Sequence, residues 1–260
     1  EKNSPVRLEG IVLGNPIVAT GDTMAILPED AIGGWDYYTG RVAVVFGGPA
    51  WIRYGRYDRL GIDAKYCTNL VRTCNDPRAT LDSRTTANPH MARDFEESCI
   101  KARKMLSATF LQPAINAGKH IFNLDKKHIP TGEDPTRLRV HYYLSCDIPC
   151  NYHQFLPDAL NEGLRILVYA GDRDLMCNWM GNLARVEELH WKGAAGFRAA
   201  VPVDYRLPKG KGIGDLKSYT LPASGGQLVF IRVNGAGHSV AVDAPQGALR
   251  MLDDFLNHKL

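Results

Sequence analysis

The sequence lacks the patterns that mark several protein classes. No apolar run approaches the roughly 18 residues that a membrane-spanning helix needs, so we expect no membrane span. The net charge is only +3, and lysines and arginines are scattered among acids instead of forming a basic stripe. This distribution argues against nucleic acid as the main partner. No closely spaced cysteine pair has a matching second pair, so we expect neither a metal site nor another cofactor.

Markers of a cellular compartment are also missing. The first residues, Glu-Lys-Asn-Ser-Pro, do not form the charged-then-apolar pattern of a signal peptide, and no Asn-x-Ser/Thr glycosylation acceptor occurs. Six cysteines are present, and Cys67 and Cys74 lie in a loop where a short disulfide would be sterically easy. The sequence alone does not fix how cysteines pair. These features leave the compartment open.

The composition is that of a globular protein. Apolar residues make up 45% of the chain and charged residues 23%. A length of 260 residues is long for one domain and short for two, which predicts one core with an insertion. We predict a core strand and turn over residues 1–19, and a lid-type insertion over 20–144, where the sequence is irregular and turn-rich. Residues 145–260 then form the second part of the core.

The core segments predict an α/β fold. The apolar runs Leu8–Leu13 and Leu228–Val233 predict buried strands, and the continuous apolar run Ile166–Ala170 is typical of a strand buried on both faces of a mostly parallel sheet. A further short strand is predicted over Val42–Phe46, inside the insertion. The stretch Pro202–Lys217 is rich in Lys, Gly and Pro, which favours a solvated loop or hairpin.

Helices are predicted between and after these strands. Apolar residues near helical spacing predict helices over about 89–110, Asn178–Leu189 and Pro245–Leu260. In the last helix, one apolar face is expected to comprise Ala248, Leu249, Leu252, Phe255 and Leu256. The sheet should therefore be flanked by helices.

Two loops carry candidate chemistry because each directly follows a buried strand. Gly171-Asp172-Arg173-Asp174 comes after the Ile166 strand, and Asn234-Gly235-Ala236-Gly237-His238 comes after the Leu228 strand. Functional groups of α/β sheets lie just past the carboxyl ends of strands. An acid followed by a histidine is the order in which α/β-hydrolases present the two partners of their serine. Either motif alone could be an ordinary surface turn, but their occurrence on consecutive core strands favours an acid–base pair.

The surrounding residues resemble a known family. The stretch Ile166–Trp191 (ILVYAGDRDLMCNWMGNLARVEELHW) resembles the acid loop of serine carboxypeptidases of the carboxypeptidase Y and cathepsin A type. Phe230–Leu256 is similar to the histidine loop and final helix of that family, and Leu8–Pro16 to the strand and turn that come after the family's serine. The resemblance implies an α/β-hydrolase fold, of which this chain forms the C-terminal part.

The resemblance also implies roles for individual residues. Asp174 matches the acid of the catalytic triad, and His238 matches the histidine. Cys177 matches a free cysteine at the substrate pocket, although a small buried apolar role is as plausible for one cysteine. Met176 matches a pocket-wall position, and Ser239 follows the histidine beside that pocket. Asn178 and Trp179 resemble residues that support the acid loop.

Departures from the family pattern leave two functions open. The Gly-Glu-Ser-Tyr-Gly turn and the Asn-Gly-Gly-Pro-Gly oxyanion segment do not occur in these 260 residues. By resemblance, the serine would lie on an upstream segment or a partner chain, and the assembly would remove C-terminal residues from peptides through an acyl-enzyme. The alternative is an inactive pseudoenzyme that acts as a structural or interaction subunit. The change from the family's Met-Val-Pro to Ser239-Val240-Ala241, and a shortened segment before residue 166, favour this alternative.

The resemblance does not fix every property. The family also includes acyltransferases and a hydroxynitrile lyase, so the substrate and the reaction stay open. Family members imply a vacuolar, lysosomal or secretory compartment.

Overall fold

The computed structural model describes residues 8–16, 66, 69–70, 73, 97–101, 104, 112–116, 118–127, 153–208 and 210–260. The chain divides into two compact units, one formed by Glu1–Pro16 with His153–Leu260 and the other by Ile17–Tyr152. Among the described residues, no helix is both long enough and apolar enough to cross a membrane.

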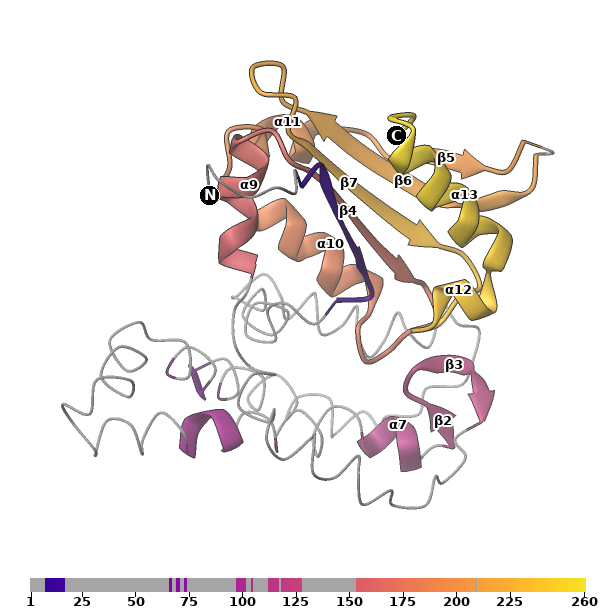
Figure 1. Ribbon diagram of the computed structural model, residues 1–260. Helices are drawn as coiled ribbons and strands as arrows, with labels where there is room; N and C mark the ends of the chain where they lie inside the picture. Colours follow the sequence, from indigo (N-terminus) through magenta and orange to yellow (C-terminus); the bar gives the residue numbers. More distant parts are fainter. Residues whose placement is uncertain are drawn as a thin grey trace. The chain divides into compact units, whose positions relative to one another are not determined.

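The first unit contains a five-stranded mixed sheet (Figure 1). The strand order is β1 (Gly10–Gly14), β4 (Arg165–Gly171), β7 (Gln227–Val233), β6 (Gly212–Thr220) and β5 (Val203–Arg206). The first three strands are parallel, and β6 and β5 run antiparallel to their neighbours. The three predicted strands and the α/β class are confirmed, but the expected burial of the first strand is wrong in the described residues, since no residue of β1 is fully buried and Val12 is 40% exposed.

Helices cover both faces of this sheet (Figure 1). After the short turn η4 (His153–Phe155), one face carries α9 (Leu156–Asn161), α10 (Trp179–Glu188) and α11 (Ala194–Ala199), and the other carries α12 (Val240–Asp243) and α13 (Pro245–Leu256). Alternate residues of β4 point to opposite sides, so Val168 joins the cluster of Phe197 while Leu167 joins that of Phe255. The result is a three-layer core, in which the predicted helices α10 and α13 are confirmed.

The prediction of a solvated loop or hairpin over Pro202–Lys217 is confirmed as to the hairpin, but the expected solvation is wrong for β6, in which Ile213, Leu216 and Lys217 are buried. These residues form the β5–β6 hairpin, and β6 pairs with β7 along its length. Glycine and lysine are unusual in a buried strand, and each has a physical reason to be in β6. A side chain at Gly214 would collide with the carbonyl oxygen of Arg232 on β7. The Nζ of the buried Lys217 lies over the Phe197 ring, 5.4 Å from its centroid, and donates to Glu187 Oε1 at 2.7 Å.

The predicted apolar face of the last helix is also wrong. Of the five expected residues, only Phe255 is buried, because α13 turns Gly247, Met251, Asp254 and Phe255 toward the sheet. One oxygen of Asp254, Oδ2, is paired there, since Tyr205 donates its hydroxyl to it at 2.7 Å and Arg250 donates to it from the preceding turn. Leu249, Leu252 and Leu256 are left exposed, at 70%, 43% and 62%. A stripe of large apolar side chains therefore lies on the outer side of the helix.

The second unit is described in part. It contains α7 (Gln112–Asn116) followed by the antiparallel pair β2 (Lys119–His120) and β3 (Asn123–Lys127). Residues 97–101 are helical, within the helix predicted over 89–110. The predicted strand Val42–Phe46, the Cys67–Cys74 loop and most of the predicted insertion lie outside the described residues. The insertion over 20–144 stays a prediction.

Candidate active site

The acid loop and the histidine loop leave the sheet side by side. Gly171 and Val233, the last residues of β4 and β7, are paired in register. The loops then bond to each other, because the N–H of Asp172 donates to the Val233 carbonyl at 2.9 Å and that of Arg173 to the Ala236 carbonyl at 2.8 Å. A Cβ on Gly171 would collide with the carbonyl oxygens of Ala236 and Gly237, so only glycine permits this close approach.

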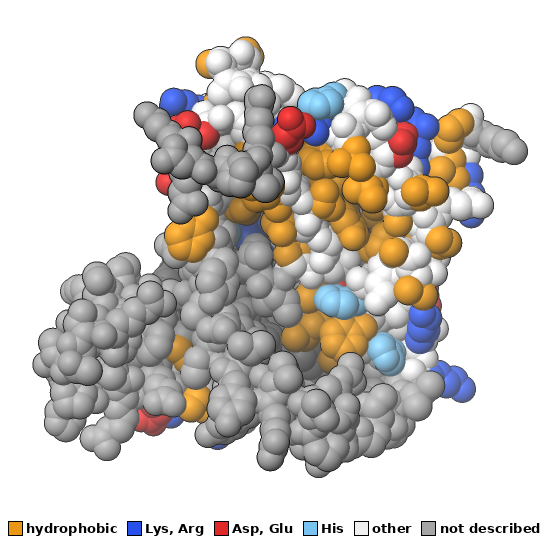
Figure 2. Space-filling model, in the orientation of Figure 1, with side chains coloured by type: hydrophobic (Ala, Val, Ile, Leu, Met, Phe, Trp, Pro, Cys, Tyr) orange, Lys and Arg blue, Asp and Glu red, His pale blue; other side chains and the backbone are white. Residues whose placement is uncertain are grey.

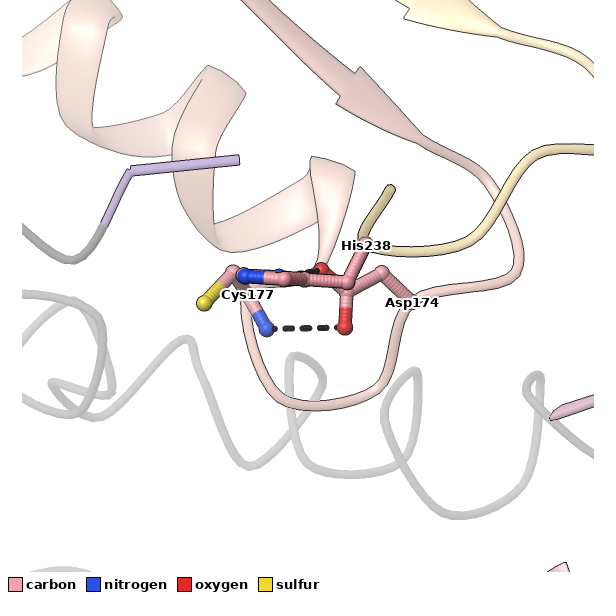
Figure 3. A group of neighbouring side chains, drawn as sticks. All are labelled: Asp174, Cys177 and His238. Atoms are coloured by element: carbon pink, nitrogen blue, oxygen red, sulfur yellow. Dashed lines mark hydrogen bonds and ion pairs between the residues drawn. The ribbon is translucent and has the colours of Figure 1, made fainter. Parts of the chain in front are cut away.

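The two loops bring Asp174 and His238 into hydrogen-bond contact. The His238 Nδ1 lies 2.8 Å from Asp174 Oδ2 (Figure 3). The Asp174 side chain is fully buried, and its Oδ1 accepts the backbone N–H of Cys177 at 3.2 Å. The His238 side chain is 37% exposed, so the pair has one buried and one accessible member. The predicted proximity of the acid and the histidine is confirmed.

The carboxylate determines the protonation of the imidazole. The hydrogen bond with Asp174 raises the pKa of His238, its negative charge adds to this effect, and desolvation by burial opposes it. Because an ionised carboxylate only accepts hydrogen bonds, Nδ1 carries the proton of the neutral ring. Proton exchange with a reacting group then falls to Nε2. Since the pKa is raised in the folded state, the pair stabilises the fold most at low pH, and this contribution is lost as the pH rises through the raised value.

Cys177 lies beside the pair but is not prepared as a nucleophile. It is a free cysteine, 4% exposed, and burial raises the pKa of its thiol, with the charge of Asp174 adding to the effect. The thiol therefore stays protonated, whereas a nucleophilic cysteine needs its thiolate. Possible metal-binding atoms of Asp174, Cys177 and His238 lie within 4.8 Å of one another. Because Oδ2 and Nδ1 already bond to each other, the arrangement is that of an acid–base pair.

Other residues predicted around the site have identifiable positions. Asn178 caps α10, since its Oδ1 accepts the N–H of Gly181 at 2.9 Å. The guanidinium of Arg232 lies over the Trp179 ring, 5.1 Å from its centroid. Met176 is half-buried in the acid loop, and Ser239 is exposed at the start of α12. The roles of Met176, Cys177 and Ser239 in a substrate pocket stay predictions.

One residue of the site was missed by the sequence reasoning. Asn15 directly follows β1, is 2% exposed, and donates from Nδ2 to Asp174 Oδ2 at 2.8 Å. In the sequence, Gly14-Asn15-Pro16 resembles an ordinary turn. The rule that identified Asp174 also applies to Asn15, because both are polar residues at the carboxyl end of a buried parallel strand.

Comparison with a solved structure defines the class of fold. The chain is similar over 99% of its length to Kex1Δp, a prohormone-processing carboxypeptidase from Saccharomyces cerevisiae, and it covers 57% of that chain. The TM-score is 0.58 and the sequence identity 18%. The fold is therefore that of an α/β-hydrolase.

Sequence comparison defines the family within that class. The family model described as serine carboxypeptidase matches residues 68–258. The chain belongs to the serine carboxypeptidase family. It is 25% identical to carboxypeptidase Y homolog A from Sclerotinia sclerotiorum over 98% of this chain and 46% of the relative, and 23% identical to carboxypeptidase Y from Komagataella phaffii over 99% and 48%. Identity reaches 41% with serine carboxypeptidase-like 47 from Arabidopsis thaliana, over 40% of this chain and 19% of the relative. The chain spans about half the length of the carboxypeptidase Y relatives.

Proposed function

We propose that this chain supplies the acid and the base of a serine carboxypeptidase that removes C-terminal residues from peptides. The nucleophilic serine comes from residues outside these 260. The observation that carries this proposal is the 2.8 Å bond between Asp174 and His238, formed at the carboxyl ends of two neighbouring parallel strands in a member of this family. An inactive scaffold has no need to retain this bond, together with the buried carboxylate that it requires.

Each member of the pair has a defined part in the proposed reaction. His238 Nε2 accepts the serine proton as the hydroxyl oxygen attacks the scissile carbonyl, and it then delivers this proton to the leaving amine. Water enters and gives a proton to the same nitrogen as it attacks the acyl-enzyme. The nitrogen then returns this proton to the serine oxygen as the acyl group leaves as a free acid. Throughout, Asp174 accepts the Nδ1 proton in a hydrogen bond and stabilises the imidazolium that forms twice per turnover.

The need for an outside serine follows from the sequence. No serine of the chain lies in a Gly-x-Ser-x-Gly turn, the arrangement that exposes the nucleophile at the end of a strand in this fold. About half of each carboxypeptidase Y relative also has no counterpart in this chain. We therefore place the serine on the corresponding remainder, either on the same polypeptide or on a partner chain.

A surface of the first unit fits such a remainder. A groove of about 330 Å³ lies between β1 and α13, and its lining includes Val12, Tyr169, Leu249 and Leu252. Apolar side chains gather over this face (Figure 2). Within the described part of the chain, β1 pairs only with β4, and it has neither the charges nor the proline that usually protect an edge strand. The occupant we propose is the serine-bearing segment, which adds a strand to β1 and covers the exposed leucines of α13.

Charges placed in this β1–α13 groove are expected to weaken that association. The double variant Leu249→Glu, Leu252→Glu should fold normally, because both side chains are exposed. It should bind a separately expressed serine-bearing segment at least about tenfold more weakly, since burying two carboxylates is costly. Sedimentation of the mixed chains measures the binding. Val201→Glu is the matched control, because Val201 is apolar, 79% exposed and lies outside the groove. Unchanged binding by the double variant, or self-association of this chain through the groove, contradicts the proposed occupant.

The function itself is tested by the products formed from blocked dipeptides. Protein that contains both this chain and the serine-bearing segment is expected to release the free C-terminal amino acid of an N-blocked dipeptide during acylation. The N-blocked residue should then appear as a free acid, because water is the final acyl acceptor. Amino-acid analysis over time measures the release. Both reactions release the amino acid, so the acyl product decides: an ester of the N-blocked residue, formed with an added alcohol in preference to the free acid, would favour an acyltransferase.

One observation favours the alternative of an inactive subunit. Ser239-Val240-Ala241 stands where the family usually has Met-Val-Pro, directly after the histidine. Ser239 begins α12 without a side-chain capping bond. An assembled protein that contains the serine but neither releases amino acids nor transfers acyl groups would establish this alternative.

A further inference from the structure

Asn15 and His238 bond to the same carboxylate oxygen. The Nδ2 of Asn15 and the Nδ1 of His238 each lie 2.8 Å from Asp174 Oδ2. Asn15 follows β1 and His238 lies in the loop after β7. These two strands lie on either side of β4, and the loop after β4 carries Asp174. The backbone N–H of Asn15 continues the ladder by donating to the Tyr169 carbonyl at 2.7 Å, so the position of Asn15 is fixed by the sheet.

The orientation of the Asn15 amide follows from its partner. Because Asp174 Oδ2 only accepts hydrogen bonds, the NH₂ group must face it, and the amide oxygen points away. That Oδ1 is buried and has no hydrogen-bond partner among the residues that the structure describes, which is an unfavourable state for a polar atom. The backbone is also left-handed here, with φ of +44°. A left-handed turn explains an asparagine or glycine at this position, but it does not explain a buried amide directed at the acid.

Sharing of one oxygen has an electrostatic consequence. From the described part of the chain, the Asp174 carboxylate accepts three N–H groups: that of Cys177 at Oδ1, and those of Asn15 and His238 at Oδ2. Each donor stabilises the negative charge and leaves less of it for the others. We propose that Asn15 is a positioning residue of the pair: it fixes the plane of the Asp174 carboxylate and, by occupying Oδ2, limits how strongly this carboxylate retains a proton on His238. The inference rests on the proposed function, in which His238 must become neutral to act as a base.

Other charged groups surround the pair and stay unchanged in the test. In the acid loop, the carboxylate of Asp172 accepts the backbone N–H of Gly235. In α12, the carboxylate of Asp243 accepts the backbone N–H of Gly237. Among the described residues, further charged or titratable side chains near the pair or its loops include Arg173, Cys177, Arg185 and Arg232. A difference between variants at position 15 therefore reports the contribution of Asn15 alone.

The test is an NMR titration of the His238 ring in the full chain, together with any polypeptide that copurifies with it. Histidines are labelled with ¹³C, and the His238 signal is identified by its loss in His238→Gln. Asn15→Gly removes the amide but keeps the left-handed backbone at no steric cost, and it should raise the pKa of His238 by roughly half a unit to one unit. Asn15→Asp keeps the size of the side chain but replaces the donor with a second carboxylate, and it should raise this pKa further, because imidazole is the stronger base and keeps the proton.

The controls separate this inference from the proposed function. Asn161→Asp adds the same charge at the last residue of α9. This residue comes shortly before the start of β4, whereas the site follows the end of β4, so the His238 titration should be unchanged. If Asn15 were only a structural turn residue, Asn15→Gly would leave the His238 pKa unchanged or let it fall toward the ordinary value as the pair loosened, and either result overturns the proposal. If Asn15→Gly does not fold, Asn15→Asp gives the same decision. The titration needs no nucleophile, so absence of hydrolysis would refute the proposed function without altering this result.

Discussion

Alanine in place of His238 is expected to lower peptide hydrolysis by the assembled protein about 10⁴-fold or more. The imidazole is the only base that the structure places on the buried carboxylate of Asp174 among the described residues. Without it, the serine hydroxyl must lose its proton to water and the leaving amine must depart unprotonated. Release of an amino acid from an N-blocked dipeptide under saturating substrate measures the loss as a change in kcat.

Two matched variants make this result specific. Asp174→Asn keeps the size of the side chain but presents an amide to Nδ1, which favours the wrong tautomer, so a loss of about 10⁴-fold is expected here as well. His190→Ala removes an exposed histidine of the same unit and should leave kcat unchanged. Retention of more than a tenth of the activity in His238→Ala would mean that another residue is the base.

The strands that carry the site could be predicted from the sequence. Strands β4 and β7 are continuous apolar runs, which is the pattern of parallel strands buried on both faces. Parallel neighbours end at the same edge of a sheet, so the polar residues that follow them, Asp174 and His238, had to lie close together. The geometry of the pair therefore followed from the order of strands and loops.

Other features depend on contacts between distant residues and could not be predicted from local patterns. Strand β6 contains Gly214 and Lys217, which suggest a loop until β7 and Phe197 are placed beside them. The face that α13 buries includes Asp254, whose Oδ2 accepts hydrogen bonds from Tyr205 of β5 and from Arg250. Periodicity alone favours burial of the leucines instead.

The role of Asn15 illustrates the same limit within the site. Its left-handed backbone and its neighbours Gly14 and Pro16 indicate a turn, and nothing nearby in the sequence indicates a charge to bind. The carboxylate that it bonds is 159 residues away. Only the pairing of β1 with β4 brings the two together.

The central claim is that this chain contributes an acid and a base to a serine that it does not itself contain. A fluorophosphonate reacts only with a serine that a base activates, so it tests the claim directly. Acyl transfer needs a nucleophile, a base and donors for the oxyanion, and removal of one triad member costs nearly as much rate as removal of all three.

The decisive measurement is therefore fluorophosphonate labelling followed by mapping of the labelled residue by mass spectrometry. The isolated 260-residue chain should not be labelled. When the serine-bearing segment is present, one serine in a Gly-x-Ser-x-Gly turn of that segment should be labelled stoichiometrically, and His238→Ala should abolish the labelling. Stoichiometric labelling of a serine within the isolated chain would contradict the claim, as would labelling of the assembled protein that persists unchanged without His238.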